Sequence, residues 1–315
     1  MKSIGGYFSL ELSSGEHFHK NGIMLNTARN CLEYILLSKQ YKKIYIPFYT
    51  CEVLLEPLKK HKIIYQFYHI NKFLEPVETF DLSAHQAFLY TNYFGVKNDA
   101  VERLANLYGK QLIVDNAQAF FSKPLNGIDI FYSPRKFFGV SDGGILFTDK
   151  LLTADFEHDI SFNRMSHLLK RIDSSAEDAY CDFKQNDNSL NNNPIKKISK
   201  LTDNLLRSID YKKVRKIRTE NFFILDLALR KSNLLNINFS NIDYAPMVYP
   251  FWAKDETLRK KLINNKIYVA TYWNNVFEWC KETDLDYIIA KNIIPLPIDQ
   301  RYNNEDMQQI INLIV

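Results

Sequence analysis

Lys136 is the residue of this chain whose surroundings most favour amine chemistry. It lies in FYSPRKFFGVSDGGILFT, residues 131–148, between a β-rich run and a glycine turn. Aromatic neighbours such as Phe137 would strip water from a lysine and favour its neutral, nucleophilic form. Ser133 and Arg135 beside it could bind a phosphate. A lone lysine is usually exposed to solvent, and that reading competes with the chemical one.

Asp115 is a second residue of chemical interest, because it ends the β-rich run QLIVD. A carboxylate at this position can pair with the protonated ring nitrogen of a cofactor. Gln118, three residues further on, can hydrogen-bond a neighbouring oxygen. The alternative is that Asp115 only caps the segment that follows.

The segment Asn26-Thr27-Ala28-Arg29 opens a predicted helix over 27–38, with Asn26 as its N-cap. Unpaired N–H groups in a first helical turn, helped by the helix dipole, can hold a phosphate without a charged side chain. An ordinary N-cap would explain this segment equally well on its own.

Taken together, the three segments contain the parts that pyridoxal phosphate requires of a protein. These parts are an amine for its aldehyde, a carboxylate for its ring nitrogen and a cradle for its phosphate. The sequence therefore predicts this cofactor.

The elements that must position these residues alternate along the first half of the chain. Helical periodicity alternates with β-rich composition, which predicts a mostly parallel sheet covered by helices on both faces. In such sheets ligands bind beyond the carboxyl ends of the strands, where the three segments lie. The predicted helices are 27–38, 51–60 and 98–109, and the predicted strands are 43–48, 63–70, 87–91, 111–115, 128–132 and 145–148.

After about residue 150 the pattern changes. Residues 173–200 are polar and lack apolar periodicity, and 186–194 (NDNSLNNNP) is predicted to be a loop or mobile segment. A long amphipathic helix is predicted over 199–231. Its basic run at 212–218 is expected to form a solvated helix face.

The last segment, 243–315, mixes short strands and helices and is predicted to be a smaller α+β lobe. We therefore expect a large cofactor-binding α/β domain over 1–198. The long helix and a small C-terminal α+β domain would occupy 199–315. Tyr272 and Trp273 in this lobe could line a sugar pocket, although packing explains them equally well.

Composition excludes several classes of protein. The 315 residues carry 40 Lys+Arg against 36 Asp+Glu, a net charge of +4, which gives no basis for nucleic-acid binding. No apolar run approaches the roughly 18 residues of a membrane span, and Glu11 and Glu16 interrupt any signal peptide. We expect a cytoplasmic protein. The four cysteines are far apart and indicate neither a metal site nor disulfides.

Several familiar motifs are absent from the sequence: GxGxxG, GxxxxGK, HExxH and GxSxG. Their absence weakens a reading as a nicotinamide oxidoreductase, nucleoside triphosphatase, zinc protease or esterase.

A series of motifs in a fixed order carries a family resemblance. They are N-T-A-R at 26–29, IPFYT at 46–50, YTNYFG at 90–95, VDNAQA at 114–119, SPRKFFGVSDGG at 133–144 and the tail IPLPIDQRYNNEDMQQIINLI at 294–314. The chain resembles the DegT/StrS family of pyridoxal-phosphate-dependent nucleotide-sugar aminotransferases. The likeness covers most of the chain and fails mainly in 155–195.

The resemblance implies the aminotransferase architecture called fold type I and a role for each matching residue. Lys136 would bond the cofactor covalently, Asp115 would bond its pyridinium nitrogen and Gln118 its phenolic oxygen. Thr27 and Ala28, with Asn26 beside them, would bind the phosphate through N–H groups, and Ser133 would add a hydroxyl. The resemblance also implies a homodimer whose subunits share their active sites.

The sequence departs from the family at two places. Ser133 lies only three positions before Lys136, a shorter stretch than the family has. Cys51 stands where the family has an aromatic residue, so Tyr49, Tyr93 and Asn92 are the candidates for contacting the cofactor ring.

A partner-chain asparagine of the family corresponds to Asn193 or to Asn163. We favour Asn193, because the long predicted helix follows it directly.

The activity implied by the resemblance is amino transfer from a donor such as L-glutamate to a keto-sugar carried on a nucleotide diphosphate. Its usual setting is the biosynthesis of surface polysaccharides. Two alternatives remain: a non-catalytic, regulatory dimer that keeps the fold, and a sugar dehydratase. Relatives of the dehydratase type have a His in place of the lysine, whereas this sequence has Lys136.

Overall fold

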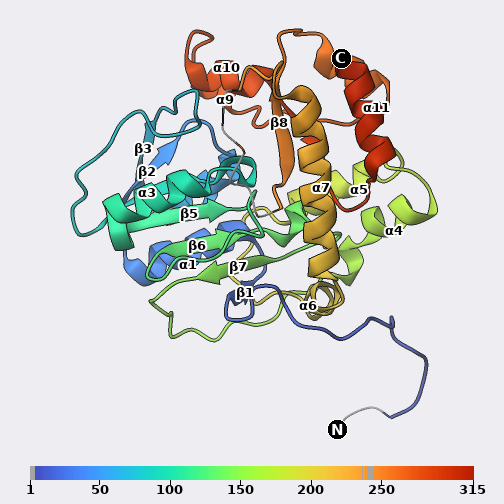
Figure 1. Ribbon diagram of the computed structural model, residues 1–315. Helices are drawn as coiled ribbons and strands as arrows, with labels where there is room; N and C mark the ends of the chain where they lie inside the picture. The colour runs from blue at the N-terminus through green and yellow to red at the C-terminus, as the bar shows by residue number, and fades with distance from the viewer. Residues whose placement is uncertain (1–3, 236, 238, 240–244) are drawn as a thin grey trace.

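The centre of the molecule is a seven-stranded sheet with the strand order β1-β7-β6-β5-β4-β2-β3 (Figure 1). The computed structural model describes residues 4–235, 237, 239 and 245–315. Strands β2 to β6 pair in parallel, whereas β7 and β1 join one edge antiparallel. The predicted mostly parallel sheet is therefore confirmed. The strands are β1 (Ile23–Leu25), β2 (Lys43–Pro47), β3 (Ile64–Tyr68), β4 (Gln86–Thr91), β5 (Leu112–Asn116), β6 (Asp129–Tyr132) and β7 (Gly144–Phe147).

Alternate residues of each strand enter two separate hydrophobic cores. Leu112 and Val114 of β5 belong to one core, and Ile113 between them belongs to the other. Successive side chains of a strand point to opposite faces, so a sheet buried on both sides has a continuous apolar sequence. Helices α3 (Asn98–Tyr108) and α7 (Tyr211–Leu229) contribute to the first core, and α1 (Ala28–Lys39) and α2 (Leu55–Lys60) to the second.

The helix predicted over 27–38 is present, but its N-cap is Thr27 and not Asn26. Thr27 has extended backbone angles and its Oγ1 accepts from the N–H of Asn30 at 3.1 Å, which is the geometry of a capping residue. The side chain of Asn26 instead bonds the main chain of Pro194 and Lys196.

The single helix predicted over 199–231 is wrong, because two helices occupy this range: α6 (Lys200–Arg207) and α7. The carboxylate of Asp210 accepts from the N–H of Lys213 and starts a new helix there. Short polar side chains offer the backbone such alternatives to a continuing helix.

The loop predicted over 186–194 is also wrong for its first residues, which form the last turn of α5 (Tyr180–Ser189). This helix follows α4 (Ser166–Asp173) and buries the side chain of Asn186. Apolar periodicity cannot detect this helix, because its buried residue is the polar Asn186.

The C-terminal segment combines a two-stranded antiparallel sheet, β8 with β9, and short helices. The α+β character predicted for 243–315 is present, although residues 243 and 244 lie outside the described residues. Its elements are β8 (Val248–Trp252), α8 (Leu258–Asn264), α9 (Val276–Trp279), α10 (Leu285–Asn292), β9 (Ile293–Pro297) and α11 (Asn304–Ile314).

Arg218 of α7 is an exception to the predicted solvated basic face, because it is only 2% exposed. Its guanidinium donates to the main-chain carbonyl oxygens of Pro246, Met247 and Phe137 and to the side chain of Gln300. This cation therefore joins α7, the C-terminal segment and the chain next to Lys136.

Across the described residues, no helix combines the length and the apolar character needed to cross a membrane. Short 3-10 turns complete the secondary structure: η1 (Glu52–Leu54), η2 (Tyr93–Gly95), η3 (Gly109–Gln111), η4 (Pro134–Lys136) and η5 (Phe162–Arg164).

Candidate active site

Asp115 lies in the middle of a row of residues that crosses three neighbouring parallel strands. It is paired in register with Thr91 of β4 on one side and with Phe131 of β6 on the other. Residues in register project to the same face of a sheet, so these three side chains lie side by side. All three line a cavity of about 120 Å³ near the carboxyl ends of the strands.

Lys136 reaches the same cavity from the turn that follows β6. The strand ends at Tyr132, and η4 turns the chain back with the N–H of Lys136 donating to the carbonyl oxygen of Ser133 at 3.2 Å. Both Ser133 and Lys136 line the cavity. Because β5 and β6 are neighbours in register, the residues after their ends meet at one place, as the sequence predicted.

The charge of Asp115 is strongly affected by its surroundings. Burial raises the pKa of this carboxyl to about 6, although the N–H of Ala117 and the ammonium of Lys136 both oppose the rise. The Ala117 N–H donates to Oδ1 of Asp115 at 2.8 Å. A buried carboxylate of this kind is stabilised by any further positive charge placed against it.

The N-terminus of α1 forms another wall of the cavity. Thr27, Ala28 and Arg29 line it, and Thr27 caps the helix. The N–H groups of a first helical turn have no carbonyl partner within the helix, so this end is suited to an anion. The side chain of Arg29 is engaged elsewhere, with Glu56 at 2.6 Å.

Gln118 brings a hydrogen-bond donor into the cavity. Its Oε1 accepts from the N–H of Phe94 at 2.7 Å, which fixes the amide with Nε2 as the remaining group. Within the described chain, Nε2 of Gln118 and Oγ1 of Thr91 are buried and have no hydrogen-bond partner. A buried polar group left in this way costs about 1–3 kcal/mol, and such groups mark a place where a ligand can bind.

Four of the residues predicted to contact the cofactor do not line this cavity: Asn26, Tyr49, Asn92 and Tyr93. Tyr49 is buried and its ring stacks on that of Tyr93, with 5.3 Å between centroids. Asn92 donates to the side chain of Asn116 at 3.0 Å. These residues support the loops around the cavity and do not face into it.

Trp273 is a cavity residue that the sequence could not distinguish from a packing residue. It lines the cavity together with Cys51, the residue that stands where the family has an aromatic side chain. Its ring meets that of Tyr49 edge-on at 5.0 Å, and Nζ of Lys136 lies 5.8 Å from the centroid of the Tyr272 ring. Burial raises the pKa of the Cys51 thiol above its usual value.

Arg135 and Asp187 form an ion pair of 2.9 Å, and both line the cavity. Asp187 belongs to α5, in the stretch that the sequence suggested to be a loop. The two residues are 52 positions apart, so no local pattern could have found this pair.

The two candidates for a partner-chain asparagine lie in different places. Asn193 donates from its side chain to the carbonyl oxygen of Ser189 at 2.9 Å. Asn163 lines a second cavity that does not contain Lys136. The preference for Asn193 stays a prediction.

Comparison with known proteins shows similarity in structure only. No protein-family model and no curated sequence matches the chain. Among solved structures, DesV from S. venezuelae is similar over 93% of this chain and 83% of its own, with a TM-score of 0.62 and 14% identity. The PLP form of the sugar aminotransferase Spr1654 from Streptococcus pneumoniae matches over 93% and 86%, with a TM-score of 0.61 and 12% identity.

A DegT DnrJ EryC1 StrS aminotransferase from Brucella abortus is similar over 93% of this chain and 84% of its own, with a TM-score of 0.60 and 12% identity. The chain thus has the fold of these three structures, and the predicted fold type I architecture is confirmed. At such identities the likeness establishes the fold, and any activity has to be inferred from the residues of the site.

Proposed function

We propose that the protein is a pyridoxal-phosphate-dependent aminotransferase that moves an amino group from a donor such as L-glutamate to a keto-sugar on a nucleotide diphosphate. Its setting would be the biosynthesis of surface polysaccharides. The observation that carries the proposal is one cavity lined by Lys136, Asp115 and Gln118 beside the N-terminus of α1, where Nε2 of Gln118 has no hydrogen-bond partner among the described residues. The name of a structural neighbour, the sugar aminotransferase CalS13 from Micromonospora echinospora, supports it.

The residues of the cavity fit pyridoxal phosphate in chemical type. The aldehyde and the electron-accepting ring of the cofactor supply the reactivity that protein side chains lack. Lys136 would bond the aldehyde, and Asp115 would face the ring nitrogen. Nε2 of Gln118 would donate to the phenolic oxygen, and the first turn of α1 with the hydroxyl of Ser133 would bind the phosphate.

In turnover, the protein's own groups would orient the reactants and move a proton. The amine of Lys136 is suited to take a proton from the substrate carbon and to deliver it to the neighbouring carbon of the cofactor. Asp115 would hold positive charge on the ring nitrogen, because a buried carboxylate is stabilised by a cation opposite it. Phe131 and Trp273 would keep water from the reacting atoms.

A homodimer is the assembly we propose. Residues 4–11, all of them exposed, extend away from the body of the molecule (Figure 1), and the side chains of Tyr7 and Phe8 are 99% and 93% exposed. Leu169 and Ile172 of α4 are exposed as well. Successive exposed apolar side chains of this size are typical of surfaces that contact another chain.

The test begins with cofactor attachment. The purified protein is incubated with pyridoxal phosphate, reduced with borohydride and mapped by peptide mass spectrometry. We expect the cofactor on Lys136 and its loss in Lys136→Ala, whereas Lys123→Ala, at an exposed lysine, keeps it.

The second step measures amino transfer. L-glutamate and a panel of nucleotide-linked keto-sugars are supplied, and 2-oxoglutarate and the amino-sugar are quantified. Formation of both products, dependent on Lys136, would support the aminotransferase. A protein that carries the cofactor on Lys136 yet forms neither product would be the regulatory alternative, and attachment elsewhere would refute the proposed site.

A further inference from the structure

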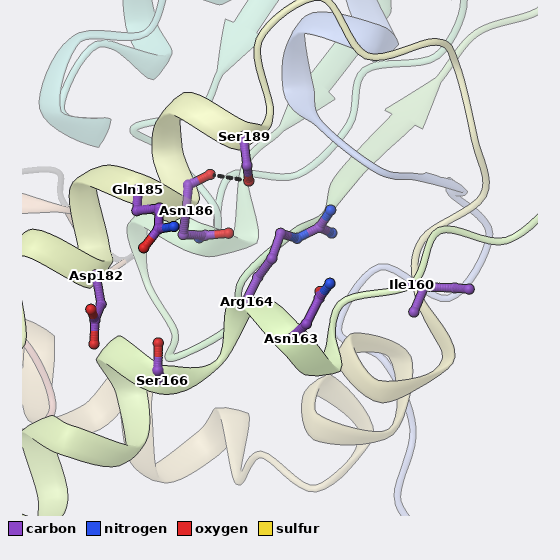
Figure 2. A pocket seen from close by; sticks show the side chains of 8 residues that line it. All are labelled: Ile160, Asn163, Arg164, Ser166, Asp182, Gln185, Asn186 and Ser189. Carbon is purple, nitrogen blue, oxygen red and sulfur yellow. Dashed lines mark hydrogen bonds between the residues drawn. The ribbon is translucent and has the colours of Figure 1, made fainter.

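A second cavity, of about 340 Å³, lies between η5 with the start of α4 and the helix α5 (Figure 2). It shares no lining residue with the cavity of Lys136. Of the eight side chains that line it, Ile160 is the only apolar one. Ligand pockets span roughly 300–1,000 Å³, so this volume suits a small ligand.

The wall formed by α5 is polar along its whole length. It consists of Asp182, Gln185, Asn186 and Ser189, whose spacing of three and four residues places them on one face of the helix. The inward face of a surface helix is normally apolar. In α5, Asn186 is the buried member of this wall, whereas Gln185 and Ser189 are exposed. The side-chain atoms of Asn186 therefore need hydrogen-bond partners other than bulk water.

Asn186 provides an acceptor without a partner. The residue is 3% exposed, and its Nδ2 donates to the carbonyl oxygen of Ser141 at 3.1 Å. That bond fixes the orientation of the amide and leaves Oδ1 buried with no hydrogen-bond partner among the described residues.

Arg164 provides a donor without a partner. Its Nη2 pairs with Asp159 at 2.7 Å, and only 14% of its side chain is exposed. Its Nε is buried and, within the described residues, has no hydrogen-bond partner. In Figure 2 this side chain rises from η5, and its guanidinium lies between Asn186 on one side and Ile160 on the other.

The charges of the cavity wall are already compensated, which decides the class of ligand. Arg164 is paired with Asp159, and Asp182 is paired with Lys170 at 2.6 Å. An anion would meet the carbonyl of Asn186 and the carboxylate of Asp182, and a cation would meet Arg164. A hydroxyl group both donates and accepts, so neighbouring hydroxyls can satisfy Asn186 Oδ1 and Arg164 Nε together.

We propose that this cavity is a binding site for an uncharged, polyhydroxylated ligand of the size of one sugar ring. The hydroxyls would bind Asn186 and Arg164, and a C–H face of the ring would contact Ile160. The site is separate from the proposed chemistry at Lys136, and it stands whether or not that chemistry is correct. Asp187, which follows Asn186 on α5, lines the cavity of Lys136, so the same helix borders both cavities.

The test uses methyl α-D-glucopyranoside, a locked sugar ring with no free carbonyl that could react with Lys136. Binding to the full-length protein is measured by saturation-transfer difference NMR titration. UDP-glucose forms a second arm, which shows whether the sugar is bound free or as part of a nucleotide sugar. Inorganic phosphate forms a third arm, for an anion-binding cavity.

Two variants locate the site, and a third is their control. Arg164→Lys keeps the charge opposite Asp159 but removes Nε, and Asn186→Ala removes the free carbonyl. We expect each to raise the dissociation constant of the glucoside at least about tenfold. Asn188→Ala, at an exposed residue of the same helix, should leave it unchanged.

Arg164→Lys keeps the inference testable if Asn186→Ala does not fold, because it leaves the bond to Ser141 intact. Loss of glucoside or UDP-glucose binding in this variant, with Asn188→Ala as wild type, would support the site. Binding that is equal in all variants, binding of phosphate alone, or no binding of any probe would overturn it.

Discussion

The side-chain amide of Asn275 donates to the main-chain carbonyl oxygen of Thr50 at 2.9 Å, which joins residues 225 positions apart. Thr50 directly precedes Cys51, and Trp273 lies two residues before Asn275. The bond therefore holds the C-terminal segment against the loop after β2 and places Trp273 at the cavity wall beside Cys51. An aromatic side chain is thus present at the cavity, although it comes from a different part of the chain than the resemblance implies.

Trp273 is expected to contribute to cofactor affinity. Trp273→Ala should raise the dissociation constant of pyridoxal phosphate about tenfold, since an aromatic wall of the cavity is lost. Equilibrium dialysis measures the effect. Trp279→Ala is the control, because Trp279 packs on Phe67 at 4.9 Å and does not line the cavity. Equal affinities of the wild type and Trp273→Ala would exclude this role.

Asp115 should make the cofactor-free protein less stable as the pH rises. Its folded-state pKa of about 6 lies above the ordinary value of 3.8, so the unfolded chain releases this proton first. The free energy of unfolding should fall by up to about 3 kcal/mol between pH 4 and pH 6 on this account. Asp115→Asn should lose this fall in the free energy of unfolding. Urea unfolding of both proteins at about pH 4.5 and about pH 7.5 would measure the difference.

The same substitution should weaken cofactor binding, although it removes a pH-dependent loss of stability from the cofactor-free protein. Asp115→Asn should bind pyridoxal phosphate more weakly, because the carboxylate no longer faces the ring nitrogen. Asp173→Asn, at an exposed residue, should change neither property. If Asp115→Asn kept the full pH dependence, another group would be responsible for it.

Arg218 should be important for stability although no carboxylate among the described residues forms an ion pair with it. Burial lowers the pKa of its guanidinium to about 10, and the side chain is held by main-chain carbonyl oxygens. Arg218→Ala leaves these acceptors unpaired and should reduce the free energy of unfolding by about 2–4 kcal/mol. Lys212→Ala, at an exposed position of the same helix, should stay within about 0.5 kcal/mol of wild type. Equal stability of the two variants would contradict this role.

The N-terminal segment should contribute to the proposed homodimer. The double variant Tyr7→Ser, Phe8→Ser removes two almost fully exposed aromatic side chains and should raise the dimer dissociation constant at least about tenfold. Sedimentation equilibrium measures it. Leu227→Ser, at an 81% exposed leucine of α7, is the control. A wild-type protein that is monomeric at micromolar concentration would refute the proposal.

The sequence alone determined the sheet and the central part of the site. Alternating helical and β-rich segments predicted the parallel strands. Asp115 lies near the carboxyl end of β5 and Lys136 follows the neighbouring strand β6, so local order along the chain brings them together. These features depend on contacts between segments that are close in sequence or joined by short connections.

Only the tertiary structure decided which other residues complete the site and which stay outside it. Trp273, the pair of Arg135 with Asp187 and the burial of Arg218 all depend on contacts between distant segments. The helix α5 was missed for a related reason. Its buried residue, Asn186, is polar, whereas apolar periodicity detects a helix only through its buried apolar side chains.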